Sequence, residues 1–294
     1  MNIDKNTITG MNSAGIKYEN RLLAIALKFK TISDANHLIY LRPTELLELL
    51  IILKSRHDKL QQASPENVEI SKSKSMDATK ALINNIPAID ISELEQPNEA
   101  LLVTSLALKN KDENFNLILM MQDQSIINLN INDFQIEIII ASIQKSMTII
   151  EDPDTTNQII SLVDFILMYS VDLVDHEYFN YKEIEHPDWK KSLFANYMAI
   201  LYSFGTDKGE RILAGVIIKT NIQPNTKELN DLIYRLSMLI PIITELKSKY
   251  TLQQSFWRII PSKSDEVLTM QQSLDYLHKF CKESQKNLVY AENK

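Results

Sequence analysis

The segment 174–189, VDHEYFNYKEIEHPDW, concentrates residue types that could do chemistry. Carboxylates and imidazoles are ligands of Zn²⁺, Mn²⁺ and Fe²⁺, and the segment offers both. The candidate ligands are Asp175, His176, Glu177, His186 and Asp188. A metal-assisted hydrolase centred on residues 175–188 is therefore one hypothesis for the function of this chain.

The spacing of these candidates matches no familiar metal motif. A helical zinc site such as HExxH places two histidines four positions apart, whereas His176 and His186 are separated by an aromatic run. The aromatic side chains of the segment are typical of residues that seal the edge of a core. We therefore expect a solvated structural connector here, with no metal ligands and no cofactor.

Other candidate catalytic residues are poorly placed in the sequence. The segment 12–17, NSAGIK, lacks the second glycine of a nucleophile elbow, and it reads as a turn before a strand. Cys281 falls on the apolar side of an expected helix, where a thiol is usually inert. His57 at a basic helix end and His278 beside an apolar stripe are both explained by structure alone. The sequence therefore favours a protein that is not an enzyme.

A nucleic-acid-associated factor is a second alternative. Binding of DNA or RNA needs a basic surface, and three small clusters are candidates: Lys54, Arg56 and Lys59 on one expected helix, Lys72 and Lys74 in the polar stretch 61–98, and Lys190 with Lys191 beside Trp189. Each cluster lies among acidic residues, and the chain has a net charge of −7. Because that charge repels phosphate, we do not expect nucleic acid to be the main partner.

Cysteine content and hydropathy predict the compartment. A single cysteine allows no intramolecular disulfide, and the N-terminus has no apolar signal region. The longest apolar stretch, 159–174, is shorter than a bilayer span and contains Asp164 and Asp172. We expect a cytoplasmic protein without membrane contact, and the heavy use of isoleucine, asparagine and lysine favours a bacterial or phage source.

The chain shows the same order of elements three times. In residues 20–59, 100–150 and 195–249, apolar β-rich segments joined by polar turns precede a helix with one apolar face. Each segment predicts a hairpin followed by a helix, a ββα unit. Because each such helix has one face to bury, we expect largely antiparallel sheet with helices packed on one face.

Turn and cap residues define the starts of the three helices. Pro43 suits a first helical position, and Asn132 with Gln135 forms a capping-box pattern. Asn225 with Glu228 repeats that pattern in the third unit. Pro241 lies within the helix that begins there and should kink it.

The remaining segments are expected to connect or cover these units. Residues 61–98 are polar and contain three prolines, which predicts a linker or surface excursion with one short helix over 76–85. Acidic residues at 151–154 favour a helix over about 155–173. A strand-like segment and an amphipathic helix capped by Ser264 complete the chain.

Together these patterns predict an α+β protein of mixed, largely antiparallel sheet. We expect an N-terminal ββα lobe over 1–60, the linker over 61–98, and a larger body over 99–294. Three hairpins leave strand edges and apolar helix faces that must be covered, which favours association with another protein or with further copies of the chain. The expected function is a non-enzymatic protein–protein interaction module, such as an adaptor, a regulatory subunit or an inhibitor.

Overall fold

The computed structural model describes residues 4–61, 65–110, 113–175, 180–262 and 267–292. Its contacts group the chain into two compact units, Met1–Val163 and Asp164–Lys294, rather than dividing it at the polar stretch 61–98. The ladders between the described strands are all antiparallel, and the protein has an α+β fold as the sequence predicts.

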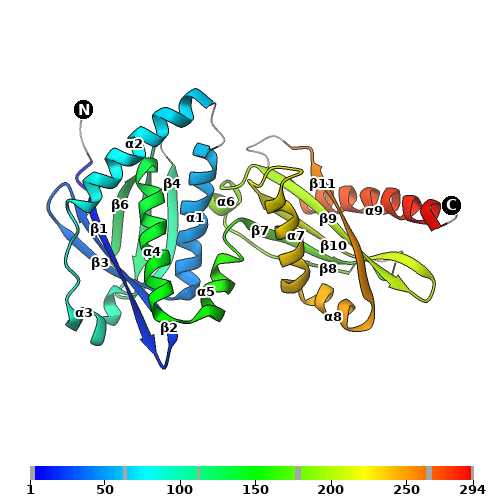
Figure 1. The fold of residues 1–294 in the computed structure, drawn as a ribbon, viewed down its shortest axis with the longest axis horizontal. Helices are drawn as coiled ribbons and strands as arrows, with labels where there is room; N and C mark the ends of the chain where they lie inside the picture. Colours follow the sequence, from blue (N-terminus) through cyan, green and yellow to red (C-terminus); the bar gives the residue numbers. More distant parts are fainter. Residues whose placement is uncertain (1–3, 62–64, 111–112, 176–179, 263–266, 293–294) are drawn as a thin grey trace. The chain divides into compact units, whose positions relative to one another are not determined.

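The first unit contains two three-stranded sheets, each followed by a long helix (Figure 1). Its first half comprises β1 (Ile8–Tyr18), β2 (Arg21–Thr31), β3 (Asn36–Leu41), α1 (Pro43–Gln61), α2 (Pro65–Ile83), α3 (Ile91–Glu95) and the 3₁₀ turn η1 (Glu99–Leu101). Its second half comprises β4 (Val103–Asn110), β5 (Asn114–Met121), β6 (Ile126–Asn132), the 3₁₀ turn η2 (Asp133–Gln135), α4 (Ile136–Ile150) and α5 (Pro153–Ile160).

Strand β1 corrects the interpretation of residues 12–17. These residues lie inside an eleven-residue strand and do not form a turn. Gly15 is needed there because α4 passes close to the strand: a methyl group at this position would lie 2.3 Å from the side chain of Ile150. The hydroxyl of Ser13 is hydrogen-bonded to the hydroxyls of Ser142 and Ser146 in α4. These serine side chains are small, so they also permit the close approach of the helix to the strand.

The two sheets of the first unit share their turn geometry. The amide of Thr31 donates to the carbonyl of Ala35, and the amide of Met121 donates to the carbonyl of Ser125, each at 2.9 Å. Inside these turns, Asp34 and Gln124 both adopt left-handed backbone conformations, with φ of 63° and 68°. The first strand of each sheet also begins with a register shift, between Ile8 and Gly10 and between Val103 and Ser105. The two halves are therefore structural repeats with the order βββα.

The repeats share their helices. α4 packs on β1 and β2 of the other repeat, whereas α1 packs on β4 and also on β2 and β3 of its own repeat. The two helices lie side by side (Figure 1). Two isolated bridges join the sheets at equivalent places: Tyr40 pairs with Leu102, and Thr7 pairs with Asn130. Each repeat thus supplies part of the cover for the other.

The expected linker over 61–98 is largely ordered. Most of it forms α2 and α3, where the sequence predicted one short helix over 76–85. Because α2 exposes most of its described side chains, its sequence lacks the apolar period by which a packed helix is recognised. The segment containing α3 also covers the outer face of the first sheet, where Leu94 packs against Ala24, Ala26 and Tyr40.

The second unit is one five-stranded sheet with the strand order β11-β9-β10-β7-β8. Its elements are β7 (Phe165–Asp172), β8 (Asn180–Glu183), α6 (Asp188–Lys191), β9 (Asn196–Thr206), β10 (Gly209–Thr220), α7 (Lys227–Leu239), α8 (Pro241–Lys249), β11 (Thr251–Ile260) and α9 (Met270–Glu292). The predicted hairpin and helix of the third ββα segment are confirmed as β9, β10 and α7.

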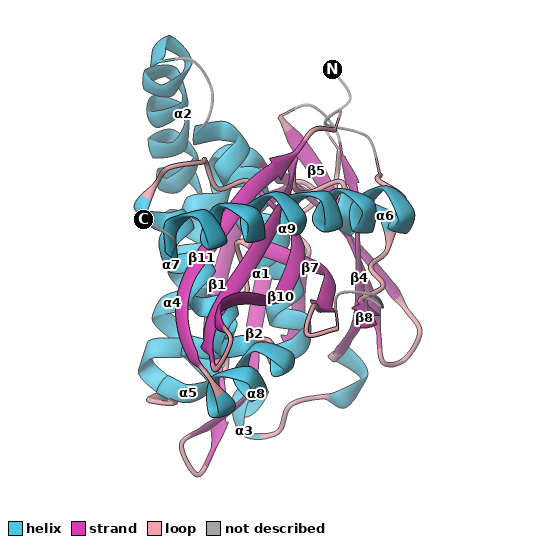
Figure 2. Ribbon diagram, turned by 90° about the vertical axis from the view of Figure 1, so that its right-hand side faces the viewer, coloured by secondary structure: helices cyan, strands magenta, loops and turns pink. Residues whose placement is uncertain are grey.

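Helices cover both faces of this sheet. Tyr202 of β9 donates its hydroxyl to the carbonyl of Ile233 in α7. The neighbouring position on the opposite face, Leu201, lies beside Gly215, whose Cα faces Leu277 of α9. Figure 2 shows α9 crossing β10 and β11, the strands it packs on. One-sided helix packing therefore does not extend to the second unit.

The prediction of one helix over 155–173 is wrong. Only its first part is helical, as α5, and the apolar run beginning at Phe165 forms β7. This strand is flanked by β8 and β10 and is buried on both faces, so its sequence shows a continuous apolar run instead of an alternation. Such a run has the same appearance in a buried helix and in a buried strand.

The predicted helix starts are partly confirmed. Pro43 opens α1, and Asn132 and Gln135 form the expected capping box, although a 3₁₀ turn precedes α4. In the third unit Thr226, not Asn225, caps the helix, because its hydroxyl accepts from the amide of Leu229. Asn225 has a left-handed φ of 60°. Pro241 separates α7 from α8 completely, and Ser264 lies outside the described residues.

Candidate functional site

The described candidate metal ligands lie at both ends of the β7–β8 hairpin. Asp172 pairs with Asn180, so Asp175 lies at the turn between the strands. His186 follows the other end of β8, where its Nε2 is 2.8 Å from the carbonyl oxygen of Leu167. The strand between Leu167 and Asp172 is roughly 17 Å long at the usual rise per residue. Asp175 and His186 therefore cannot share one metal ion in this conformation.

The other candidates add no ligand cluster. Asp188 begins α6 with an exposed carboxylate 3.7 Å from the ammonium of Lys191. His176 and Glu177 lie outside the described residues. Across the described ranges, no three His, Cys, Asp or Glu residues are grouped closely enough to hold a metal ion. The opening segment of the sequence is thus spread along a hairpin and a short helix.

The predicted basic clusters do not form open patches. Arg56 is largely buried and makes two hydrogen bonds to Asp133, of 2.5 and 2.6 Å, while its guanidinium lies over the ring of Phe115. Lys54 pairs with Asp58 on the same helix. Lys59 and Lys190 also have interactions with other residues. Arg56 therefore binds a carboxylate inside the first unit and is not presented to phosphate.

Cys281 and His278 lie on α9 as the sequence predicts. Cys281 is buried, and burial raises the pKa of its thiol to about 11. His278 is half-buried, and burial together with Lys282 lowers the pKa of its imidazole. A thiol with a raised pKa is a poor nucleophile, so α9 supplies packing residues rather than a catalytic pair.

A buried lysine in β10 was not anticipated. The side chain of Lys219 is 1% exposed, and its ammonium donates to the carbonyl oxygen of Lys191 at 2.7 Å. The ammonium also lies 4.6 Å from the ring centre of Tyr197. The carbonyl of Lys191 is at the C-terminal end of α6, where a positive charge is favoured. Lys219 therefore anchors α6 to the sheet.

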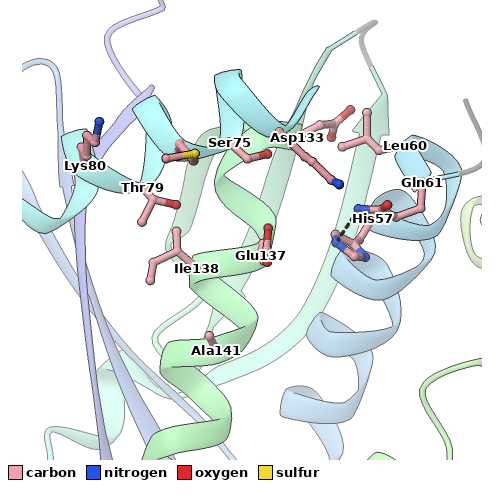
Figure 3. A pocket seen from close by; sticks show the side chains of 12 residues that line it. His57, Leu60, Gln61, Ser75, Thr79, Lys80, Asp133, Glu137, Ile138 and Ala141 are labelled. Atoms are coloured by element: carbon pink, nitrogen blue, oxygen red, sulfur yellow. Dashed lines mark hydrogen bonds between the residues drawn. The ribbon is translucent and has the colours of Figure 1, made fainter. Parts of the chain in front are cut away.

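A cavity of about 530 Å³ opens between α1, α2 and α4 in the first unit (Figure 3). We call it the helix groove. Its lining residues are His57, Leu60 and Gln61 from α1, Lys72, Ser75, Met76, Thr79 and Lys80 from α2, Asp133 from η2, and Glu137, Ile138 and Ala141 from α4. A cavity of this size is within the range of known ligand and peptide sites.

Two contacts hold α2 over the helix groove. At the midpoint of α2, the Lys74 ammonium is 3.0 Å from a carboxylate oxygen of Glu113 and 4.7 Å from the ring centre of Phe134. Past its end, the backbone of Asn85 lies so close to β1 that a methyl group on Gly10 would be 1.9 Å from the Asn85 carbonyl oxygen. Between these two contacts, the second half of α2 passes α4 without filling the space beneath it.

Several polar groups in the helix groove have no partner among the described residues. Ser75 and Thr79 project from α2 on the side of α4, as Figure 3 shows, and neither hydroxyl makes a hydrogen bond there. Lys72 and Glu137 likewise form no ion pair with described residues. The carboxylate of Asp133 is already neutralised by Arg56. These groups are therefore available to a bound molecule.

The helix groove also has an apolar wall. Met76, which lines the groove, is 62% exposed. Just beyond the groove lining, Ile83 is 51% exposed and Ile86 is 53% exposed. A smaller cavity of about 70 Å³, lined by Ile83, Ile86 and Ile138 among others, continues the hollow along α2. Exposed apolar side chains gathered at a hollow are typical of binding surfaces.

Sequence reasoning missed the helix groove because it treated 61–98 as a connector. The signal available was the placement of Met76 and Ile83 in a polar stretch seven positions apart, which is two helical turns. The cavity itself depends on how far α2 stands from α4, and a local pattern does not contain that distance.

The family described as YjeJ-like matches residues 4–287 of the chain. A relative from Escherichia coli strain K12, named Uncharacterized protein YjeJ, is 30% identical over 274 residues. The alignment covers 92% of this chain and 94% of that relative, so it spans both units. No solved structure matches the chain.

Proposed function

Because the chain belongs to the YjeJ-like family, and the name of its relative describes no activity, we propose a function from the geometry of the first unit. The protein is a non-enzymatic protein–protein interaction module. Its helix groove receives an amphipathic helix from a partner. The observation that supports this proposal is the open cavity between α1, α2 and α4, with its apolar wall and its unpartnered polar groups.

The dimensions of the helix groove suit a helical ligand. From Lys72 to Ile83, α2 extends for roughly 17 Å at the usual helical rise, which is about three turns. Recognition of a helix in a groove uses apolar anchors one or two turns apart, and Met76 with Ile83 provides contacts at that spacing. Ser75 and Thr79 offer hydrogen bonds at the margin of the same surface.

The charges of the helix groove favour one kind of helix. Lys72 and Lys80 lie on the α2 side, and Glu137 lies on the α4 side. With Asp133 paired to Arg56, the two lysines outnumber the remaining carboxylate. A partner helix with a small excess of acidic residues beside its apolar anchors would match this surface, because complementary charge selects partners and speeds association.

Site-specific photo-crosslinking tests the proposal. A photoreactive residue at Met76, inside the helix groove, should capture a defined partner, whereas the same residue at Ile149 should not. Ile149 is a matched control because it is 66% exposed on α4 and does not line the groove. The captured partner is then prepared in pure form, and its affinity is measured against the wild-type chain and Thr79→Trp, which fills the cavity.

We expect Thr79→Trp to weaken binding by roughly tenfold or more, since buried contacts at the centre of an interface carry most of its energy. Ile149→Glu should bind like the wild type. Equal capture from both positions, or an unchanged affinity of Thr79→Trp, would overturn the proposal.

A further inference from the structure

The second unit has one long sheet edge that no described strand covers. Its sheet ends at β11 on one side and at β8 on the other. β11 pairs with β9 (Figure 1), and the opposite side of β11 forms no backbone ladder with any described residue. An edge strand presents a row of amide and carbonyl groups that can pair with another strand. The outer side of β11 is therefore a surface that can accept a further strand.

Two contacts show how the backbone groups of β11 are directed. The amide nitrogen and the carbonyl oxygen of Gln254 lie 3.3 and 3.1 Å from the hydroxyl oxygen of Ser203 in β9, so this residue faces into the sheet. The carbonyl of Ile259 instead accepts from the hydroxyl of Tyr276 in α9 at 3.1 Å. Gln254 and Ile259 therefore direct their backbone groups to opposite sides of the strand.

The residues between them follow by alternation. Neighbouring residues of an antiparallel strand direct their backbone groups to opposite sides. Phe256 and Arg258 therefore face β9, as Gln254 does. Ser255, Trp257 and Ile259 direct their amides to the open edge, where no described strand receives them.

The two edges of the sheet differ in their protection. β8 has four residues, all exposed, and it includes Lys182 and Glu183. A short edge strand with charged side chains resists pairing with other strands. β11 has ten residues without proline or lysine, and its register with β9 is unbroken from Gln254 to Ile260. The sheet therefore has one protected edge and one open edge.

The side chains of β11 permit contact with an identical strand. Its single charged side chain, Arg258, is 2.7 Å from a carboxylate oxygen of Glu283 in α9 and lies over the ring of Phe280. Two copies of the strand can therefore meet without unpaired like charges. Phe256 and Trp257 are only partly buried within their own unit, so a second strand would cover apolar surface on both faces of the sheet.

We propose that β11 pairs antiparallel with β11 of a second copy of this chain, about a twofold axis close to Ser255 and Trp257. In this arrangement the amides of each strand meet the carbonyls of the other, and both copies use the same residues. Two five-stranded sheets become one continuous sheet. Because β8 is protected, pairing ends at two copies and does not extend into a filament. The contact uses the second unit alone and is separate from the helix groove, which lies in the first.

Charges introduced at Ser255 test the proposal in the full-length chain. Ser255 is exposed and lies in the unbroken part of β11. Sedimentation equilibrium should show a dimer for the wild type. Ser255→Lys and Ser255→Glu should each raise the dimer Kd by roughly tenfold or more, because like charges then lie close together across the axis. An equimolar mixture of the two variants should recover the dimer, since the charges across the axis are then opposite.

Asn230→Lys and Asn230→Glu are the matched controls. Asn230 is exposed on α7 and lies outside β11, and its variants change the net charge by the same amounts. Both should dimerise like the wild type. Circular dichroism of the four variants should match the wild-type spectrum, which separates lost pairing from lost folding.

Amide hydrogen exchange of the wild-type chain locates the contact without any substitution. In the dimer, the Phe256 amide bonds to β9 and the Trp257 amide bonds to the second copy, so both should exchange slowly. Dilution to the monomer should speed exchange at Trp257 by roughly tenfold or more and leave Phe256 protected. A wild-type chain that stays monomeric, Ser255 variants that dimerise normally, or equal exchange at Trp257 in dimer and monomer would overturn the proposal.

Discussion

Asp152 connects two elements of the first unit through one carboxylate. One oxygen accepts from the amide of Leu22 in β2 at 2.9 Å, and the other accepts from the amide of Thr155 in α5 at 3.1 Å. The bond from Leu22 contributes most to lowering the pKa of this carboxyl, and the bonds from Thr155 add to the effect. Each of the two hydrogen bonds uses a different oxygen of Asp152 as its acceptor, and the ionised carboxylate offers both oxygens as acceptors.

Replacing Asp152 with Asn should destabilise the protein in a pH-dependent way. Since the pKa of Asp152 is lowered on folding, its stabilisation is complete above the unfolded value of about 3.9 and is lost as the pH falls through the folded pKa. The urea midpoint of Asp152→Asn should lie below that of the wild type at neutral pH, and the two should converge in acid. A constant difference at all pH values would show that the carboxylate charge is not the cause.

Cys281 leads to a prediction about reactivity. Because burial raises the pKa of its thiol to about 11, almost no thiolate is present at mildly alkaline pH. The native chain should react slowly with a disulfide reagent such as DTNB. After denaturation, the single thiol should react rapidly and release one equivalent of thionitrobenzoate per chain. Fast reaction of the native chain would mean that α9 opens in solution.

At the scale of elements, α7 offers a test of packing. Leu232 and Leu236 are both fully buried between this helix and the sheet. Leu232→Ala and Leu236→Ala should each lower the free energy of unfolding by about 2–5 kcal/mol, through lost apolar burial and the cavity left behind.

Asn230→Ala is the matched control for these leucines, because Asn230 lies on the exposed face of the same helix. It should change the free energy of unfolding by about 0.5 kcal/mol or less. Denaturant unfolding of the three variants gives the comparison. Small losses for both leucines would mean that α7 is held mainly by its ends.

Elements with a clear period could be predicted from the sequence, and elements without one could not. The strands β2, β3, β5 and β6, together with α1 and α4, follow the expected order. β5 alternates in burial and α4 buries one face, whereas β2 and β3 are marked mainly by the polar turn between them. β7 is buried on both faces and α2 is largely exposed, so neither shows a period of its own. Both were therefore assigned incorrectly.

The candidate site was harder to predict than the fold. The ligand types in 174–189 are close in sequence, but the β7–β8 hairpin separates Asp175 from His186. The helix groove has the reverse property, since His57, Thr79 and Glu137 are far apart in sequence and meet only when α2 crosses α4. Sequence proximity and spatial proximity thus disagree at both places.

At the scale of the whole molecule, the two units have separate cores and separate sheets. The boundary is marked by Asp164, whose carboxylate pairs with Arg235 of α7 at 2.6 Å and whose carbonyl accepts from Thr220. These contacts keep Asp164 in the second unit. Across the described residues, no helix is both long and apolar enough to cross a bilayer.

Fragments 1–163 and 164–294 should therefore each fold when expressed alone. Each should give a cooperative urea transition, with a slope smaller than that of the full chain because less surface is exposed on unfolding. Circular dichroism showing an unfolded spectrum for either fragment would mean that its core needs the other unit.

The packing of α4 on the sheet of the other βββα repeat has a consequence for the origin of the first unit. A half-length chain with only the second repeat would carry α4 without β1 and β2, the strands on which it packs. Such a chain could bury that helix only by swapping it with an identical chain, as domain-swapped dimers do. Joining two copies in tandem would have made the swap internal, and the second copy would then be released from symmetry. The helices that follow α1 and α4 are α2 and α5, and they differ in length. This difference between the repeats is one that independent change of the two copies would produce.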